Sequence, residues 1–108
     1  MIDIAYQNTE LESLLTRGSS ATFKAVMNKK LFMQKLCSFS TLLHVINNVV
    51  ELKFYSYLHY KRNSTFSTVT VESTGLYGNI VFSEEEQGKR VTIYDLILNE
   101  DYGKERSI

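Results

Sequence analysis

A basic cluster lies in the middle of the chain, where His59, Tyr60, Lys61 and Arg62 follow one another. A histidine titrates near neutral pH, so it can accept or donate a proton under physiological conditions. Cations beside it would stabilise the charge that develops on a phosphate during cleavage of a phosphodiester. The same residues would also form an ordinary solvated turn with a surface histidine. The cluster is therefore either a site that acts on a polyanion or a basic turn without chemistry.

Tyr102 is the second candidate for proton transfer, in the segment NEDYGKERSI, where Lys104 and Arg106 follow it. A tyrosine can stack on a nucleobase or donate its phenolic proton. The alternative is a charged chain segment with one amphipathic side chain. Arg90, at the beginning of the last expected strand, is a further candidate cation.

The remaining reactive residue types do not form a metal or cofactor motif. His44 and His59 are fifteen positions apart, and neither has a carboxylate or cysteine at ligand spacing. Cys37 is the only cysteine, which excludes an intrachain disulfide and paired-cysteine metal motifs. The five glycines are scattered singly, so no phosphate-binding loop or dinucleotide fingerprint occurs. We expect no metal and no small-molecule cofactor.

The composition is that of one globular domain, which we place over residues 1–108. Hydrophobic residues make up 44% of the chain, enough for a core. Twelve Lys and Arg balance twelve Asp and Glu, so bulk charge provides no general attraction to nucleic acid or to a membrane. No apolar run approaches the roughly 18–20 residues of a membrane span, and the first residues lack a signal-peptide pattern. We expect a cytoplasmic protein.

The elements that would position these residues begin with a short strand over residues 2–6, where apolar residues alternate. A short helix should follow through Arg17, capped by Asn8 or Thr9. Gly18 makes a natural end for this helix, because glycine takes positive φ at little cost.

A longer helix is expected over residues 20–38, capped by Ser19 or Ser20, with several lysines mostly outside its apolar face. Ser40 would then cap a separate helical stretch that ends near Asn47 and Asn48. The first half of the chain is therefore expected to be mainly helical.

The sequence of the second half of the chain predicts strands, because β-branched and aromatic residues become frequent from Val49 onward. The charged run SEEEQGK reads as a hairpin loop. Short glycine-bearing connections indicate an antiparallel meander. We therefore expect an α+β fold, with the N-terminal helices packed on one face of a small, mainly antiparallel β-sheet. The strand-like segments are residues 49–60, 66–72, 76–83 and 89–98.

This order of elements resembles the RelE/HigB superfamily of toxins from bacterial type II toxin–antitoxin pairs. The resemblance covers about residues 2–103, and its landmarks are VTV, IVF, VTIYDLIL and the terminal DYG. It implies an endoribonuclease that cleaves messenger RNA, typically in the ribosomal decoding site, by metal-independent attack of a ribose 2′-hydroxyl on the adjacent phosphate. It also implies a cognate antitoxin that covers the site.

The resemblance gives each candidate residue a role. Lys61 and Arg62 would bind the phosphate of the RNA, with Arg90 as a further cation. His59 or Tyr102 would transfer protons.

Two positions differ from the family pattern, in which the meander commonly reads Ser-x-Arg-Ile and then Arg-Ile-x-Phe. Thr70 and Asn79 stand where the two arginines are expected, and they bring hydrogen bonds but no charge. Either His59 and its basic neighbours supply the cations from other positions, or the fold has lost cleavage and serves as a partner-binding or regulatory module. A small interaction domain unrelated to toxins, whose strands pair with another chain, is the third alternative.

Overall fold

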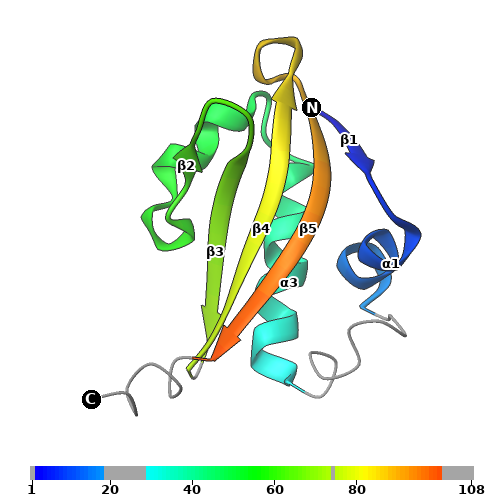
Figure 1. Ribbon diagram of the computed structural model, residues 1–108, viewed down its shortest axis with the longest axis vertical. Coiled ribbons are helices and arrows are strands. Elements are labelled where there is room, and N and C mark those ends of the chain that lie inside the picture. The colour runs from blue at the N-terminus through cyan, green and yellow to red at the C-terminus, as the bar shows by residue number, and fades with distance from the viewer. Residues whose placement is uncertain (1, 19–28, 74, 101–108) are drawn as a thin grey trace.

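The structure is a computed structural model that describes residues 2–18, 29–73 and 75–100 (Figure 1). The strands in these residues are β1 (Asp3–Tyr6), β2 (Lys61–Arg62), β3 (Ser67–Ser73), β4 (Leu76–Glu85) and β5 (Arg90–Glu100). The helices are α1 (Thr9–Arg17) and α3 (Lys30–Leu43), with the 3₁₀ turns η1 (Val49–Phe54), η2 (Ser56–Leu58) and η3 (Glu86–Gly88). The predicted α+β class is confirmed.

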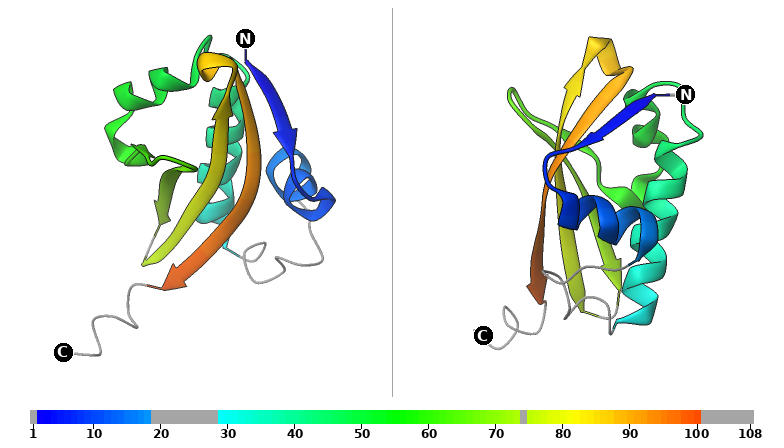
Figure 2. Two further views of the ribbon diagram at one scale, coloured as in Figure 1. Left: turned by 45° about the horizontal axis from the view of Figure 1, so that its top comes forward. Right: turned by 90° about the vertical axis from the view of Figure 1, so that its right-hand side faces the viewer.

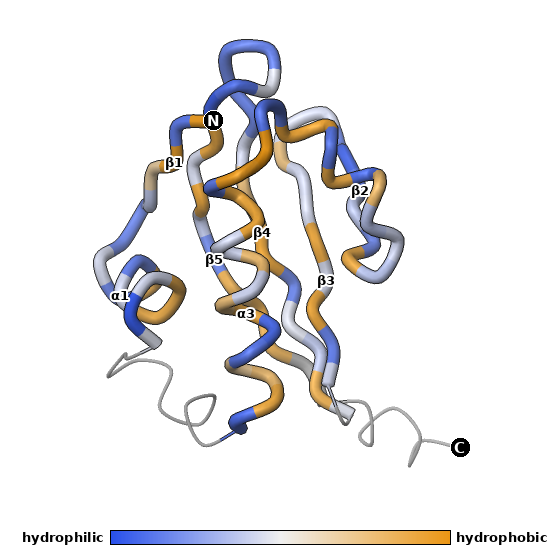
Figure 3. The backbone as a smooth tube through the Cα atoms, turned by 180° about the vertical axis from the view of Figure 1, so that it is seen from behind, coloured by the Kyte–Doolittle hydropathy of each residue, from blue (hydrophilic) through white to orange (hydrophobic). Residues whose placement is uncertain are grey.

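The strands form one sheet in the order β1-β5-β4-β3-β2. β3, β4 and β5 make the antiparallel meander that the alternating sequence predicts. β1 pairs with β5 in parallel, so Ile4 lies opposite Val91. At the other edge, the two residues of β2 pair with the beginning of β3. β4 runs further toward the hairpin than expected, whereas β5 begins at Arg90 and continues past its expected end to Glu100. The turn η3 forms the tip of the hairpin, which is hydrophilic (Figure 3).

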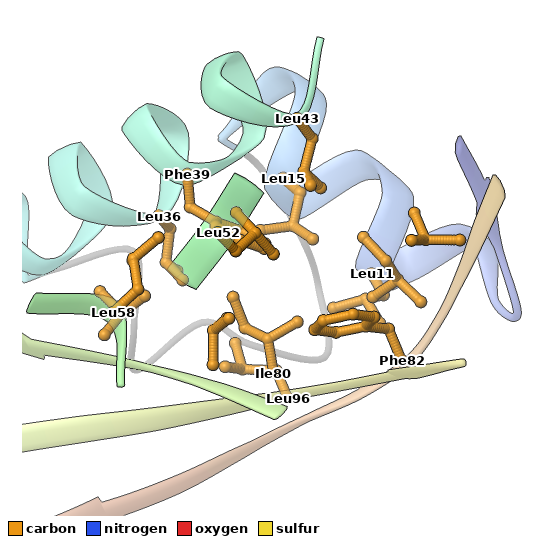
Figure 4. Packing of buried hydrophobic residues seen from close by; sticks show 14 of the residues in the cluster. Leu11, Leu15, Leu36, Phe39, Leu43, Leu52, Leu58, Ile80, Phe82 and Leu96 are labelled. Carbon is orange, nitrogen blue, oxygen red and sulfur yellow. The ribbon is translucent and has the colours of Figure 1, made fainter. Parts of the chain in front are cut away.

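The helices lie on one face of this sheet, as expected, and the right-hand view of Figure 2 shows α1 and α3 on the same side. Burying each large aliphatic or aromatic side chain between these layers contributes about 1.5–3 kcal/mol. The core residues of α3 and η1 point toward the sheet in Figure 4: Leu36, Phe39 and Leu52 face Ile80, Phe82 and Leu96.

Gly78 on β4 permits the close approach of α3 to the sheet. A β-carbon placed there would lie 2.6 Å from Cζ of Phe32 and 3.0 Å from Cδ1 of Leu96. The first distance is shorter than carbon atoms tolerate, so a side chain at this position would push the helix and sheet apart.

The predicted ends of the first helix are confirmed. The Asn8 side chain accepts a hydrogen bond from the Leu11 N–H at 2.7 Å, which caps the first turn of α1. At the other end Gly18 takes a φ of 71°, and its N–H bonds to the Leu14 carbonyl at 2.9 Å.

The prediction of two helices over residues 20–48 was wrong at Ser40, which is buried inside α3 and does not begin a new helix. α3 continues through Leu43, because Phe39 and Leu43 extend the apolar stripe of Leu36 at helical spacing. Residues 20–28 of the expected long helix lie outside the described residues.

The prediction of a strand over residues 49–60 was also wrong, because this segment forms the turns η1 and η2. The Asn48 side chain accepts from the Val50 N–H at 3.0 Å and begins a helical turn. Val49, Leu52 and Leu58 are buried at multiples of three residues, which is the period of a 3₁₀ helix and not of a strand. Packing of these side chains overrides the β propensity of the sequence.

Candidate functional site

A cleft of about 270 Å³ lies between α3, η2 and β3, and we call it the His59 cleft. It brings together side chains from three segments that are far apart in the sequence. Its polar lining is Lys35, Ser38, Tyr57, His59 and Glu72, and its apolar lining is Phe39, Leu58 and Val71.

His59 enters this cleft because the backbone reverses direction at that residue. Its φ of 50° and ψ of 47° are left-handed, which is uncommon for a residue other than glycine. The His59 N–H bonds to the Ser56 carbonyl at 3.1 Å, which closes η2. Leu58, which is 3% exposed, and the half-buried Tyr60 fix the chain on either side. The histidine itself stays exposed, so a ligand in the cleft can reach it.

The other polar groups of the cleft come from regular elements. Lys35 lies three residues before Ser38 on one face of α3, and Glu72 lies on β3. The lining thus includes a histidine that can transfer a proton and an ammonium group that can stabilise a negative charge. Glu72 is exposed where β3 borders the cleft, and it has the same alternation as Thr70. The sequence alone gave no sign of Lys35 or Glu72 as site residues, because only the tertiary fold brings α3 and β3 to His59.

Lys61 and Arg62 form β2, immediately after the cleft residue, but Arg62 lines a different hollow with Asn48 and Glu84. Its Nε lies 3.7 Å from Oε1 of Glu84. The Arg62 side chain is 71% exposed and that of Glu84 only 7%. Lys61 is exposed on the edge strand. The structure therefore splits the basic cluster, with His59 in one cavity and Arg62 beside another.

Glu84 is the centre of a small polar network. The sequence did not reveal this network, because Glu84 belongs to the charged run for which a hairpin loop is predicted. The hydroxyls of Tyr60 and Ser67 both donate to its Oε2. Burial, followed by the hydrogen bond donated to Glu84, raises the pKa of Tyr60 to about 12. One sequence signal could have placed Glu84 on the buried face of the sheet. Glu84 lies two residues after the buried Phe82, and side chains at that spacing on a strand share a face.

Arg90 does not join the His59 cleft, because it lies beside the β4–β5 hairpin. Its Nε is 3.1 Å from Oε1 of Glu85, the residue opposite it in the register. Glu85 also accepts from the hydroxyl of Ser83 at 3.0 Å. Tyr102 lies outside the described residues, so its role stays a prediction.

Thr70 and Asn79, at the positions expected to hold arginines, lie directly opposite each other on β3 and β4. The Thr70 hydroxyl donates to Asn79 Oδ1 at 2.7 Å. Their alternation places them on the sheet face away from α3, since their neighbours Val69, Val71 and Ile80 are buried against the helix. We call this side of the sheet the open face, and Thr70 and Asn79 add no charge to it.

Over residues 2–18, 29–73 and 75–100, no three His, Cys, Asp or Glu side chains are arranged to hold a metal ion. In the same residues no helix has both the length and the apolar character needed to cross a membrane. Comparison with family models, with curated proteins and with solved structures found no match to this chain.

Proposed function

We propose that this chain is the toxin of a toxin–antitoxin pair and cleaves messenger RNA at the His59 cleft, in the cytoplasm and without a metal ion. The observation that carries the proposal is the meeting of His59, Lys35 and Glu72 in one cavity. The order of elements adds support, because a strand and helices precede an antiparallel meander, as the resemblance to RelE/HigB toxins requires. Messenger RNA, the ribosome and a cognate antitoxin are the partners this proposal implies.

Cleavage begins when the ribose 2′-hydroxyl attacks the adjacent phosphorus, while one side chain takes its proton. The P–O5′ bond breaks, a second side chain protonates the leaving 5′-oxygen, and a 2′,3′-cyclic phosphate remains. Glu72, at the exposed border of the cleft, is the proton acceptor, His59 is the proton donor, and Lys35 stabilises the charge on the non-bridging oxygens. Tyr102 is the second candidate donor.

The remaining cations contribute to RNA binding outside the cleft. Lys61 lies two residues after His59 and is exposed, so it can contact a neighbouring phosphate. Arg62 and Arg90 are both paired with carboxylates, and each must exchange that partner for a phosphate before it binds RNA. For Arg62 this exchange is accessible, because its side chain is exposed and Glu84 would keep the hydrogen bonds from Tyr60 and Ser67.

A second function, a partner-binding module that does not cleave RNA, is favoured by a separate set of contacts. Arg62 and Arg90 are neutralised by Glu84 and Glu85, and the open face presents the uncharged pair of Thr70 and Asn79. In this reading the chain keeps the fold and its antitoxin, but the two positions on that face where the family has arginines carry no charge.

Inducible expression in a bacterial host tests the two functions, with and without the neighbouring gene. Under the first, induction arrests growth, new messenger RNA 5′ ends appear, and co-expression of the neighbour reverses both effects. Arrest without new 5′ ends would favour the second function. Normal growth in every arm would contradict the first function.

Variants then locate the chemistry. His59→Asn suits the left-handed backbone, because asparagine tolerates positive φ, and it removes the titrating ring. His44→Asn is the matched control, since His44 lies at the end of α3 with its Nδ1 2.8 Å from the Ser40 carbonyl, outside the cleft. We expect His59→Asn to abolish the new 5′ ends and His44→Asn to keep them.

A further inference from the structure

The buried carboxylate of Glu84 has no part in the chemistry proposed above, yet both of its oxygens are engaged. Oε2 accepts hydrogen bonds from the hydroxyls of Tyr60 and Ser67. Oε1 faces Nε of Arg62 at 3.7 Å. A carboxylate with a 7% exposed side chain is costly to bury without such partners. Glu84 therefore connects β4 to Tyr60 and Arg62, which follow His59 in the chain, and to Ser67 at the beginning of β3.

The contact with Tyr60 fixes the segment that carries the histidine. Tyr60 directly follows His59, and its ring stacks on Phe82 with centroids 6.4 Å apart. The described backbone hydrogen bonds around this segment are few: His59 N–H bonds to Ser56, and Asn63 N–H bonds to Phe66. β2 adds only two paired residues. The Tyr60 hydroxyl bond to Glu84 is thus a major tie between the segment and the sheet.

The contact between Glu84 and Arg62 offsets the positive charge of the arginine. At 3.7 Å it is longer than a hydrogen bond, and the Arg62 side chain is 71% exposed, so the pair is electrostatic and open to exchange. Glu84 nevertheless neutralises one of the two cations that β2 presents at the sheet edge. Without that carboxylate, Lys61 and Arg62 would attract a polyanion together.

We propose that Glu84 has two opposed effects on the RNA site. Through Tyr60 it is a positioning residue that holds His59 in the cleft, and through Arg62 it lowers the affinity of β2 for the RNA backbone. The inference rests on the proposed RNA-cleaving function. It explains why an acidic residue is buried next to the basic cluster, where charge alone would disfavour it for an RNA-binding protein.

The effect of Glu84 on RNA affinity is tested by measuring oligonucleotide binding to the Glu84→Gln variant. This substitution keeps the side-chain shape and an acceptor oxygen but removes the charge. The probe is a fluorescent single-stranded 2′-deoxy oligonucleotide of about twelve nucleotides, within the usual site sizes, which cannot be cleaved because it lacks the attacking hydroxyl. We expect about two- to fivefold tighter binding, the range set by one exposed charge pair. The slope of log affinity against log salt should steepen by about 0.7, for one added phosphate contact.

Two matched variants make this result specific. Glu85→Gln removes the same charge one residue along the chain, but it releases Arg90 at the hairpin and should tighten binding less. Adding Arg62→Ala to Glu84→Gln should cancel the gain, because the released cation is then absent. Binding by Glu84→Gln that is no tighter than wild type or Glu85→Gln, including no binding by any of them, would overturn this effect.

The positioning effect is tested by Tyr60→Phe, which keeps the stacked ring and removes the hydroxyl bond to Glu84. Backbone amides of His59 and Asn63 should exchange hydrogen several-fold faster than in wild type, while those of β4 keep their rates. In a cleavage assay kcat should fall several-fold at nearly unchanged KM, since the ring is displaced but the cations remain. Unchanged exchange at both amides would overturn the positioning role.

These readouts separate this inference from the proposed function. If the chain cleaves no RNA, the cleavage assay fails for every variant and the proposed function falls. The oligonucleotide affinity and the amide exchange still decide whether Glu84 lowers polyanion binding and holds the His59 segment.

Discussion

Thr70 on β3 donates a hydrogen bond to Asn79 on β4, with 2.7 Å between their oxygens. The two residues are partners in the register of the strands, and each satisfies a polar group of the other. A resemblance to RelE/HigB toxins would place arginines at both positions. The proposed RNA cleavage would therefore need cations from other positions, and the His59 cleft offers Lys35.

Thr70→Val should leave RNA cleavage intact, because the chemistry is assigned to the His59 cleft and not to the open face. The substitution removes one half-buried hydrogen bond, which costs about 0.5–1.5 kcal/mol of unfolding free energy. Valine's preference for strands offsets part of this loss. Growth arrest on induction, measured beside urea unfolding, checks both statements. Loss of arrest in a folded Thr70→Val protein would move the site to the open face.

Gly78→Ala should destabilise the protein by about 1–3 kcal/mol, as overpacked core positions do. The added methyl group would lie 2.6 Å from Cζ of Phe32, so the Phe32 ring or α3 itself must move. Chemical unfolding measures the change. In the double variant with Phe32→Leu, the crowding atom is gone, and the combined loss should be smaller than the sum of the single losses. Simple additivity would mean that α3 does not approach β4 this closely.

Stability at alkaline pH should depend on Tyr60. Its pKa is raised from 10.0 to about 12, first by burial and then by the hydrogen bond to Glu84. Because the folded-state pKa is the higher one, the stability that this phenol contributes is complete below pH 10. It is lost as the pH rises from about 10 to about 12, where only the unfolded state gives up the proton.

The comparison of wild type with Tyr60→Phe isolates this effect, since the two proteins differ only in this hydroxyl group. Unfolding free energy should fall less steeply in Tyr60→Phe between about pH 10 and about pH 12. Tyr57→Phe, at a side chain that is 66% exposed, should behave as wild type. Equal pH dependence in all three proteins would rule out the buried Tyr60–Glu84 contact.

Asn48→Ala should cost about 0.5–2 kcal/mol of unfolding free energy, the usual range for loss of a helix cap. The Asn48 side chain accepts from the Val50 N–H and donates to the Gln87 carbonyl at 2.9 Å, so it also ties η1 to the hairpin. Asn63→Ala, at an exposed residue, is the control. If both variants have the stability of wild type, this contact contributes nothing measurable.

Local signals predicted the parts of the fold that depend on near neighbours. Asn8 and Gly18 fixed the ends of α1, because a cap acts over three or four residues. Val69 and Val71 alternate, and β3 follows that period. The strand prediction for residues 49–60 was wrong for the opposite reason. Packing of Leu52 in the shared core, and not local propensity, decides the conformation of this segment.

The candidate site was predicted only in part for the same reason. His59 is recognisable as a titrating residue in a basic cluster, and it does line a cleft. Its neighbours there, Lys35 and Glu72, come from elements that meet only in the folded chain. The ion pairs of Arg62 and Arg90 could not be foreseen either, because they depend on the register and side-chain direction of the β4 hairpin.

The most direct test of the central claim is cleavage of a defined RNA by the purified protein, with the chemistry of the new ends determined. The account predicts 2′,3′-cyclic phosphate and 5′-hydroxyl ends, with chelator present, and no cut at a linkage whose 2′-hydroxyl is replaced by hydrogen. His59→Asn should slow cleavage by about 10²–10⁴-fold, the usual contribution of a general acid or base, and His44→Asn should not. Equal rates for His59→Asn and wild type, or cleavage at the 2′-deoxy linkage, would contradict it.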